Sequence, residues 1–369
     1  MKGYSLEKAV YILLFLFFFF AGLIYAKPFL MPVLFASLLA MLLLPLSNWL
    51  VGKGINKALS IVICILIFLS FFVLLGWLIS WQVSDLSKNS RELEENLMQK
   101  LKQLQFYISN SFGISPEQQE QMVQKQRQSG GGMSGFLSGV LAGVGGFLTN
   151  LLIVLVYIFL FLFYRDHLKT FIIKLVPKSE EAKTKKIIAD SSKVVQKYLT
   201  GLFLMIIGLW IMYSIGFTIA GVKNAIFFAI LCGLLEIIPF VGNLAGNAIT
   251  ILVAVAQGGD ITMILGILIT YALVQFIQSY ILEPLVVGSE VNLHPLFTIA
   301  GIVLGELVWG IPGMILAIPI MGITKIICDN VESLKPFGYL IGEEKKKGDK
   351  NLKDKIKGMF KSDSSTKSK

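Results

Sequence analysis

Acidic residues are scarce in the apolar second half of the chain, and two of them stand just before sequences that break helices. Glu236 lies three residues before Pro239 between two apolar runs, and Glu306 precedes the Gly-Ile-Pro-Gly sequence at 310–313. An acid at the centre of a membrane costs about 2.5–3.5 kcal/mol on insertion scales, so it needs a partner, a water-filled cavity or a proton. We therefore expect these carboxylates to bind a proton, a cation or a polar solute.

The residues around the first break add groups that a binding site needs. Pro239 leaves a backbone carbonyl without its helical partner, because proline has no N–H. Gly242 allows a ligand to approach the backbone closely, and Asn243 and Asn247 carry amides four residues apart on one helical face. Interrupted helices of this kind often form the substrate or ion site of a transporter near the membrane midplane.

The second break repeats the pattern, with Glu306 upstream of Pro312. We interpret the two segments together as a substrate or ion pathway. In the alternative interpretation both breaks are packing kinks, and the two acids pair with Lys223, Lys325 or the backbone.

Polar residues also interrupt the apolar stretch 261–282 and its continuation. Gln275 and Gln278 share a helical face, and Glu283 follows five residues later. A polar stripe on an apolar membrane helix usually faces the bundle interior or a cavity. These three residues are candidates for the same pathway, with hydrogen bonding between helices as the alternative. His294 precedes Pro295, a favoured first residue of a helix, so we expect it to be a structural cap or loop contact.

The chain as a whole is too apolar and too sparsely charged for a soluble protein of its size. Of its 369 residues, 55% are hydrophobic and 15% are charged, whereas soluble domains have about 25% charged residues. The formal charge of +10 would suit a nucleic-acid partner, but 27 phenylalanines in charge-free runs argue against one. The sequence contains no HExxH, CxxC or phosphate-binding Gly-Lys-Ser/Thr motif, so we predict no enzyme, no metal and no cofactor.

Charge-free runs of about 20 residues indicate membrane helices. Eight apolar segments, of which the sixth and eighth contain a few charges, predict an all-α, polytopic membrane helix bundle, with broken or re-entrant segments in its C-terminal half; they cover 9–26, 29–50, 58–81, 135–164, 198–220, 224–257, 261–282 and 295–327. The first run is interpreted as a retained anchor and not as a signal peptide, because it is long and more spans follow at once. The very short link at Lys27-Pro28 predicts that the first two helices form a hairpin. The segment 224–256 is either one broken helix or two short ones.

The runs divide the chain into six parts: a hairpin with the third span (1–82), an extracytoplasmic polar helical segment (83–134), the fourth span (135–164), a cytoplasmic basic loop (165–197), a transporter core (198–342) and a disordered Lys-rich tail (343–369). Basic residues in short loops mark the cytoplasmic side of a membrane protein. We therefore predict that both termini and the basic loops 52–57 and 165–197 are cytoplasmic.

The polar segment carries leucines at helical spacing, from Leu86 through Leu93 and Leu97 to Ile108. This seam packs either on the protein's own membrane domain or on a second copy. Glycines spaced by four at 135, 139 and 143 allow close approach of helix backbones in lipid. Together these features predict a homo-oligomer held by the polar helix and the glycine-rich span.

Several short sequences in the C-terminal half are specific enough to suggest a family. They are Leu-Glu-Ile-Ile-Pro-Phe-Val-Gly-Asn at 235–243, Tyr-Ile-Leu-Glu-Pro-Leu-Val-Val-Gly at 280–288, Leu-His-Pro-Leu at 293–296, Gly-Ile-Pro-Gly-Met at 310–314 and Ala-Ile-Pro at 317–319. In order and spacing this region resembles the autoinducer-2 exporter family of bacterial permeases along roughly 160–330. One departure is Asn243, where the family often has proline. The resemblance implies a bacterial inner-membrane transporter.

Three functions fit these observations. The first is a secondary transporter of a small polar solute, for which the resemblance implies an autoinducer-2-like molecule and export. The second is a sodium(lithium)/proton antiporter, for which Glu236 would be the first candidate carboxylate. The third is a membrane scaffold that transports nothing and holds partners through its outer helix and basic loops. The expected partners are a small polar solute, Na⁺ or H⁺, and the lipid bilayer, with no nucleic acid.

Overall fold

The computed structural model describes residues 6–88, 91–100, 132–239, 241–287 and 293–343. Within these ranges the regular structure is helical, and the one extended pairing is an isolated bridge between Leu293 and Gly342. The predicted all-α bundle is therefore confirmed. The elements are α1 (Leu6–Tyr25), α2 (Lys27–Gly52), α3 (Lys57–Lys88), α6 (Gly132–Phe163), α7 (Arg165–Lys174), η1 (Lys178–Glu180), α8 (Glu181–Ile219), α9 (Ala225–Leu235), α10 (Val241–Ala256), α11 (Ile261–Ile277), η2 (Gln278–Val287), α12 (Pro295–Trp309), α13 (Ile311–Asn330), η4 (Glu332–Leu334) and α14 (Lys335–Ile341).

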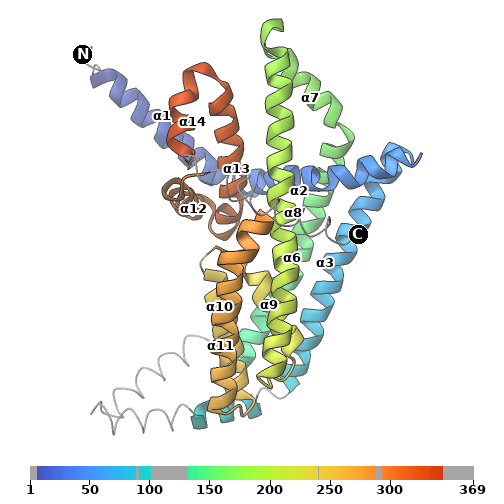
Figure 1. Ribbon diagram of the computed structural model, residues 1–369, viewed down its shortest axis with the longest axis vertical. Helices are drawn as coiled ribbons and strands as arrows, with labels where there is room; N and C mark the ends of the chain where they lie inside the picture. The colour runs from blue at the N-terminus through green and yellow to red at the C-terminus, as the bar shows by residue number, and fades with distance from the viewer. Residues whose placement is uncertain (1–5, 89–90, 101–131, 240, 288–292, 344–369) are drawn as a thin grey trace, which may run out of the picture.

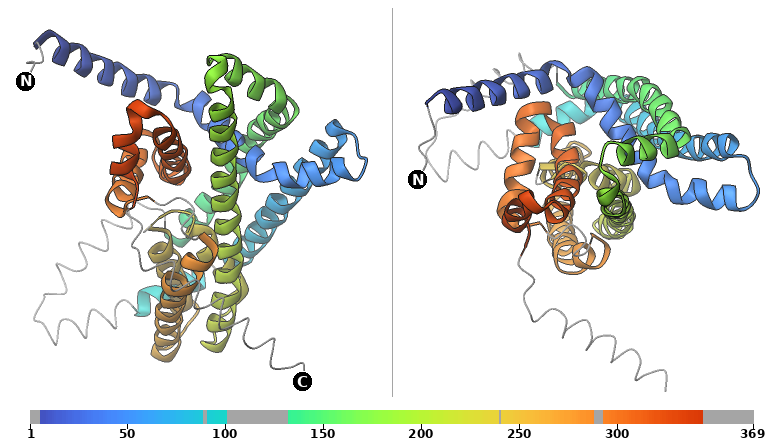
Figure 2. Two further views of the ribbon diagram at one scale, coloured as in Figure 1. Left: turned by 45° about the horizontal axis from the view of Figure 1, so that its top comes forward. Right: turned by 90° about the horizontal axis from the view of Figure 1, so that it is seen from above.

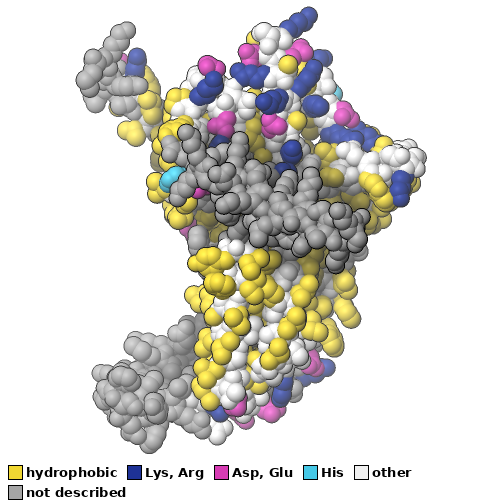
Figure 3. All heavy atoms as spheres, in the orientation of Figure 1, with side chains coloured by type: hydrophobic (Ala, Val, Ile, Leu, Met, Phe, Trp, Pro, Cys, Tyr) yellow, Lys and Arg dark blue, Asp and Glu magenta, His cyan; other side chains and the backbone are white. Residues whose placement is uncertain are grey.

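Among the described elements, α3 packs along α6, and α8 packs along α9, α11 and α13 (Figure 1). Among the described residues, six helices are long and apolar enough to cross a membrane: Lys27–Gly52, Lys57–Lys88, Leu137–Phe163, Lys178–Ile219, Ile261–Leu282 and Ile311–Asn330. The side chains that cover the outside of this bundle are mainly hydrophobic, and Lys and Arg gather at the end where α7 and α8 begin (Figure 3). Such a surface is stable when lipid covers it, so the chain is a multi-pass membrane protein.

The predicted hairpin of the first two helices is wrong, because α2 runs on from α1 and does not fold back along it (Figures 1 and 2). Helical hydrogen bonding continues through the joint. The Ala26 N–H donates to the Gly22 carbonyl, and the Ala26 carbonyl accepts from the N–H groups of Phe29 and Leu30 at 3.1 and 2.8 Å. Pro28 does not interrupt it, since proline in the first turn of a helix removes an N–H that has no helical partner there.

The segment 224–256 consists of two short helices, α9 and α10, that form a hairpin. A Cβ added to Gly242 would overlap the carbonyl oxygen of Leu235, and one added to Gly246 would lie 2.9 Å from the Cα of Cys232. These paired positions run in opposite directions along the two helices, which makes the packing antiparallel. With 11 residues, α9 is about 17 Å long, too short to cross a hydrocarbon core of about 30 Å.

The predicted last span, 295–327, is also folded back on itself. Gly310, at φ 71° and ψ −149°, ends α12 and begins the reversal into α13, a conformation that glycine adopts without a Cβ penalty. The backbones of Gly305 and Gly313 then pack against each other, since a Cβ on either would overlap the other's carbonyl oxygen. The hairpin is anchored by Trp309, whose Nε1 donates to the Leu23 carbonyl of α1 at 2.9 Å.

His294 is the N-terminal cap of α12, with Nδ1 accepting from the Leu296 N–H at 3.3 Å. The predicted structural role of this histidine is therefore confirmed.

The first part of the leucine seam packs within the protein. Leu86 and Leu93 are buried and join Leu137 and Leu209 in one hydrophobic cluster. Residues 101–131, with the rest of the seam, and the predicted tail after 343 lie outside the described residues.

Among the described residues, Gly139 and Gly143 of α6 meet no neighbouring helix. A Cβ added to Gly139 or Gly143 would have no atom within 4 Å. The contact between α3 and α6 is made instead at Gly76, where an added Cβ would lie 3.3 Å from Val144. The homo-oligomer that these glycines suggested stays a prediction.

Candidate functional site

The α9–α10 hairpin carries the first predicted acid at its tip. Glu236 is the C-terminal cap of α9 and is half-buried. The length of α9, about 17 Å, is roughly half the thickness of a hydrocarbon core of about 30 Å, so we expect the tip near mid-depth. The Nε2 atom of the buried Gln278 donates a 2.8 Å hydrogen bond to Oε1 of Glu236. The acid and one residue of the predicted polar stripe are thus in direct contact.

Amides from three elements meet beside this acid. Asn243 and Asn247 are buried on the first turns of α10, 8% and 3% exposed. The Nδ2 atom of Asn243 donates to Oε1 of Gln275 on α11, and Nδ2 of Asn247 donates to the Asn243 carbonyl at 3.0 Å. Gln275 continues the chain of bonds, because its Nε2 donates to Ser279 Oγ at 3.3 Å.

Tyr213 on α8 closes this polar cluster, which we define as Tyr213, Glu236, Asn243, Asn247, Gln275 and Gln278. The Tyr213 hydroxyl donates to Oδ1 of Asn243 and accepts from Nδ2 of Asn247, both at 3.3 Å. The tyrosine is fully buried. Sequence reasoning missed it, although a signal was present. Met205, Leu209, Tyr213 and Phe217 recur every four residues on the buried face of α8, and the hydroxyl is the polar group in that row.

Two buried acceptors of the cluster remain open among the residues that the structure describes. Oδ1 of Asn247 and Oε1 of Gln278 are buried and have no hydrogen-bond partner among the described residues. An unsatisfied buried polar atom costs about 1–3 kcal/mol, so such atoms are retained where they serve a purpose. These two oxygens are suited to bind a donor group or a cation.

The turn at the tip positions these groups. The Val241 N–H donates to the Pro239 carbonyl at 2.7 Å, and the Gly242 N–H donates to the Ile238 carbonyl at 3.0 Å. Gly242 is buried at the close approach of the two helices. Because it has no side chain, α10 can begin against the end of α9. Pro239 and Gly242 thus shape the turn, while the amides and the carboxylate are the groups available to a ligand.

The second predicted acid lies elsewhere. Glu306 is exposed on α12, and its backbone carbonyl accepts from the Gly310 N–H at 2.6 Å. Pro312 is half-buried in the first turn of α13. In the described part of the chain, α12 and α13 pack on α1, α2 and α8, and their hairpin lies apart from α9 and α10 (Figure 1). Glu283 lies in η2, but its side chain is outside the described residues.

The cluster combines one carboxylate with neutral amides and a hydroxyl. The described residues contain no group of three or more His, Cys, Asp or Glu side chains that would hold a metal ion. Amide and carboxylate oxygens suit hard cations or polyhydroxylated molecules. A polar cluster at the tip of a broken hairpin inside an apolar bundle is typical of transporters.

Comparison of the chain with known protein families identifies one that matches it. Residues 13–333 match the family described as "AI-2E family transporter". The chain belongs to the AI-2E transporter family. The match includes the entire polar cluster and both hairpins, and it confirms the resemblance seen in the sequence.

Curated relatives of this AI-2E family chain are named as transport proteins. "Putative transport protein YrrI" of Bacillus subtilis is 26% identical over 310 residues, which cover 82% of this chain and 86% of that protein. "Putative transport protein YueF" of the same organism is 30% identical over 201 residues, 53% of each chain. A "Putative transport protein" of Methanothermobacter thermautotrophicus is 27% identical over 184 residues, 48% of this chain and 54% of its own. The family and these names support a membrane transporter.

Proposed function

We propose that the protein is a secondary transporter that moves a small polar solute past the polar cluster at the tip of the α9–α10 hairpin. The observation that carries this proposal is the meeting of Glu236 with the amides of α10, α11 and η2 inside an apolar bundle. A membrane-embedded carboxylate and buried amides are costly unless they serve a function. The family supports transport as that function.

The chemistry of the cluster favours a neutral, hydroxyl-rich solute. Asn247 and Gln278 each offer a buried oxygen without a partner among the described residues. Hydroxyl groups donate to such oxygens and accept from amide nitrogens, so a compact polyol can replace the bonds that the amides now make with one another. An autoinducer-2-like furanosyl molecule belongs to this class, and we propose its export as the activity to test first.

Proton or sodium coupling would act through Glu236, the carboxylate of the cluster. The 2.8 Å bond from Gln278 places amide groups beside this carboxylate, and a sodium(lithium)/proton antiporter is therefore the second candidate. In that function the cation would displace a proton from Glu236 and bind the neighbouring amide oxygens.

Transport assays in proteoliposomes separate the two candidates. Purified protein is reconstituted, and uptake of radiolabelled autoinducer-2 precursor is measured beside sodium-driven proton flux reported by a pH-sensitive dye. Glu236→Gln should abolish proton flux if the protein is an antiporter. Asn247→Leu should reduce solute flux by roughly tenfold, a loss of ~1.4 kcal/mol.

Matched controls come from outside the cluster. Asn150→Leu alters an exposed amide on α6 that bonds only to the carbonyl one turn earlier among the described residues. Glu332→Gln alters an exposed acid paired with Lys335. The proposal of solute transport fails if Asn247→Leu and Asn150→Leu transport equally well while wild-type flux is measurable.

We propose the orientation of the protein in the membrane from the distribution of its Lys and Arg residues. The basic residues of α7 and the start of α8 would face the cytoplasm of a bacterial inner membrane, as the positive-inside rule requires. Labelling of Lys185→Cys in intact cells by an impermeant maleimide tests this. Reaction only after the membrane is opened supports it, and reaction in intact cells contradicts it.

A further inference from the structure

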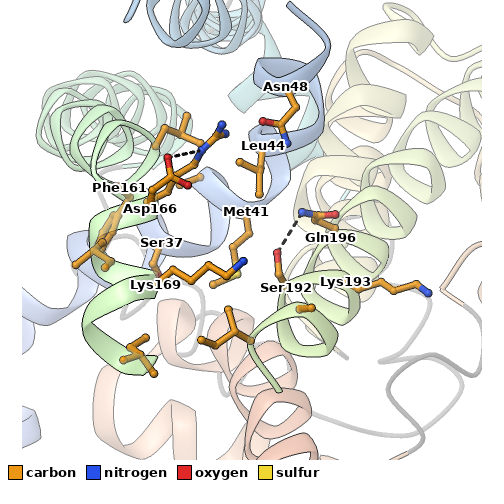
Figure 4. Close-up of a pocket in the computed structure, with 17 residues that line it drawn as sticks. Ser37, Met41, Leu44, Asn48, Phe161, Asp166, Lys169, Ser192, Lys193 and Gln196 are labelled. Carbon is orange, nitrogen blue, oxygen red and sulfur yellow. Dashed lines mark hydrogen bonds and ion pairs between the residues drawn. The ribbon is translucent and has the colours of Figure 1, made fainter. Parts of the chain in front are cut away.

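A hollow lies at the basic end of the bundle, between α2, the end of α6, α7 and the start of α8 (Figure 4). Its volume is about 650 Å³. It shares no lining residue with the polar cluster. The proposed transport function therefore leaves this cavity unexplained.

The charges around the cavity are unbalanced. Arg165, Lys169 and Lys193 line it together with one acid, Asp166. That acid is already engaged, because it accepts a 2.8 Å ion pair from Lys57 Nζ and lies 3.8 Å from Arg165 Nε. An excess of positive charge is therefore left in the cavity.

Lys169 is the cation best placed to meet a ligand. Its side chain extends across the cavity toward Ser192, while Lys193 points away (Figure 4). In the described part of the chain, the Lys169 ammonium forms no ion pair. The Nη1 atom of Arg165 is buried without a hydrogen-bond partner among the same residues. An anion in the cavity would be held by the Lys169 ammonium and the Arg165 guanidinium, since both residues line it.

The rest of the wall is divided between polar and apolar groups. Asn48, Ser192 and Gln196 add hydrogen-bonding side chains from α2 and α8. Met41, Leu44 and Leu168 form an apolar part of the wall. A wall of this composition fits a ligand with an anionic head and a hydrocarbon tail better than it fits a free ion.

The position of the cavity agrees with such a ligand. Charged side chains cover the end of the bundle where α7 and α8 begin, and the hydrophobic surface begins below them (Figure 3). A phospholipid places its phosphate at this kind of boundary and its acyl chains beside the apolar surface. Basic pockets between membrane helices bind anionic headgroups in this way.

We propose that this cavity is a binding site for an anionic glycerophospholipid, with the headgroup phosphate bound by Lys169 and Arg165 and an acyl chain on the Met41–Leu44 face of α2. The site goes beyond the proposed transport of a solute. It links α2, α7 and α8, so an occupied site would brace the basic end of the bundle.

Native mass spectrometry of the full chain in detergent tests the site, with phosphatidylglycerol and zwitterionic phosphatidylcholine added separately. Wild-type protein should retain phosphatidylglycerol in preference to phosphatidylcholine. Lys169→Gln should weaken phosphatidylglycerol binding by about fivefold, and Lys169→Arg should restore it. Lys174→Gln, an exposed lysine on the same helix that does not line the cavity, is the matched control and should bind as wild type.

Thermal unfolding of the same samples shows whether each variant is folded. Phosphatidylglycerol should raise the melting temperature of wild type and of Lys174→Gln more than that of Lys169→Gln. Equal binding by Lys169→Gln and Lys174→Gln would overturn the proposal. Displacement of the lipid by an equal concentration of glycerol 1-phosphate would also overturn it, because the cavity would then recognise a free phosphate and not a lipid.

Discussion

Gln278 donates a 2.8 Å hydrogen bond to Glu236, although 42 positions separate the two residues in the chain. Glu236 ends α9, and Gln278 begins the π-helical stretch that follows α11. Both residues therefore lie where regular helical geometry is interrupted. Such π-helical turns occur frequently at functional sites. The bond joins the tip of the α9–α10 hairpin to η2. A displacement of either segment would therefore move the other or break the bond.

The two predicted acids should differ in their effect on transport. Glu236 contacts Gln278 inside the bundle, whereas Glu306 is exposed on α12. Glu236→Gln should lower flux by roughly tenfold or more, equivalent to ~1.4 kcal/mol, while Glu306→Gln should retain most of it. The measurement is initial flux in proteoliposomes at matched protein content. Equal losses in the two variants would contradict the assignment of the pathway to the first hairpin.

Gly242 should not tolerate a side chain. Alanine there would place a methyl group into the carbonyl oxygen of Leu235, so the hairpin would have to open. We expect Gly242→Ala to destabilise the protein by about 1–3 kcal/mol, the usual cost of overpacking. Tryptophan-fluorescence melting in detergent measures this. Gly139→Ala, where an added Cβ meets nothing within 4 Å, is the control and should melt like wild type. Identical melting of the two variants would show that the hairpin tip has room for a methyl group beside the Leu235 carbonyl.

Removing the Tyr213 hydroxyl should loosen the polar cluster. Tyr213→Phe leaves Asn243 and Asn247 buried with one partner fewer each, which should cost about 1–3 kcal/mol. The check is a chemical-denaturation or thermal-melting series in detergent. The matched control is Tyr280→Phe, because Tyr280 is 72% exposed. If Tyr213→Phe and Tyr280→Phe are equally stable, the hydroxyl does not organise the two asparagines.

The link between the start of α3 and the start of α7 should weaken in acid. The hydrogen bond from Lys57 lowers the pKa of Asp166 below its usual value. A lowered folded-state pKa means that this stabilisation is present above about pH 4, the pKa of an unfolded aspartate, and is lost as the pH falls through the folded value.

The effect should be small, because the Asp166 side chain is 75% exposed and exposed pairs contribute about 1 kcal/mol or less. Melting temperatures of wild type and Asp166→Asn between pH 7 and pH 3 provide the measurement. The variant should be slightly less stable at pH 7, and the difference should shrink toward pH 3. A constant difference across this range would exclude ionisation of Asp166 as its cause.

Much of this protein is determined by its sequence alone. Charge-free runs of membrane length are sufficient to predict an all-helical membrane bundle, because backbone polar groups in lipid must pair within each helix. Glu236, Asn243, Asn247, Gln275 and Gln278 stand out from such runs, since every polar group in them carries a cost. The motifs from 235 to 319 indicate the family in the same way.

Other features depend on contacts between distant parts of the chain, which a local pattern does not contain. A proline or glycine in an apolar run predicts an interruption, but a kink and a complete reversal have the same local signal. The reversals at 236–241 and at Gly310 are decided by backbone packing between glycines, such as Gly305 against Gly313. Helix packing likewise adds Tyr213 of α8 to the polar cluster and leaves Glu306 of α12 outside it. Residue types and spacing therefore select the candidates for the site, and helix packing decides which of them meet.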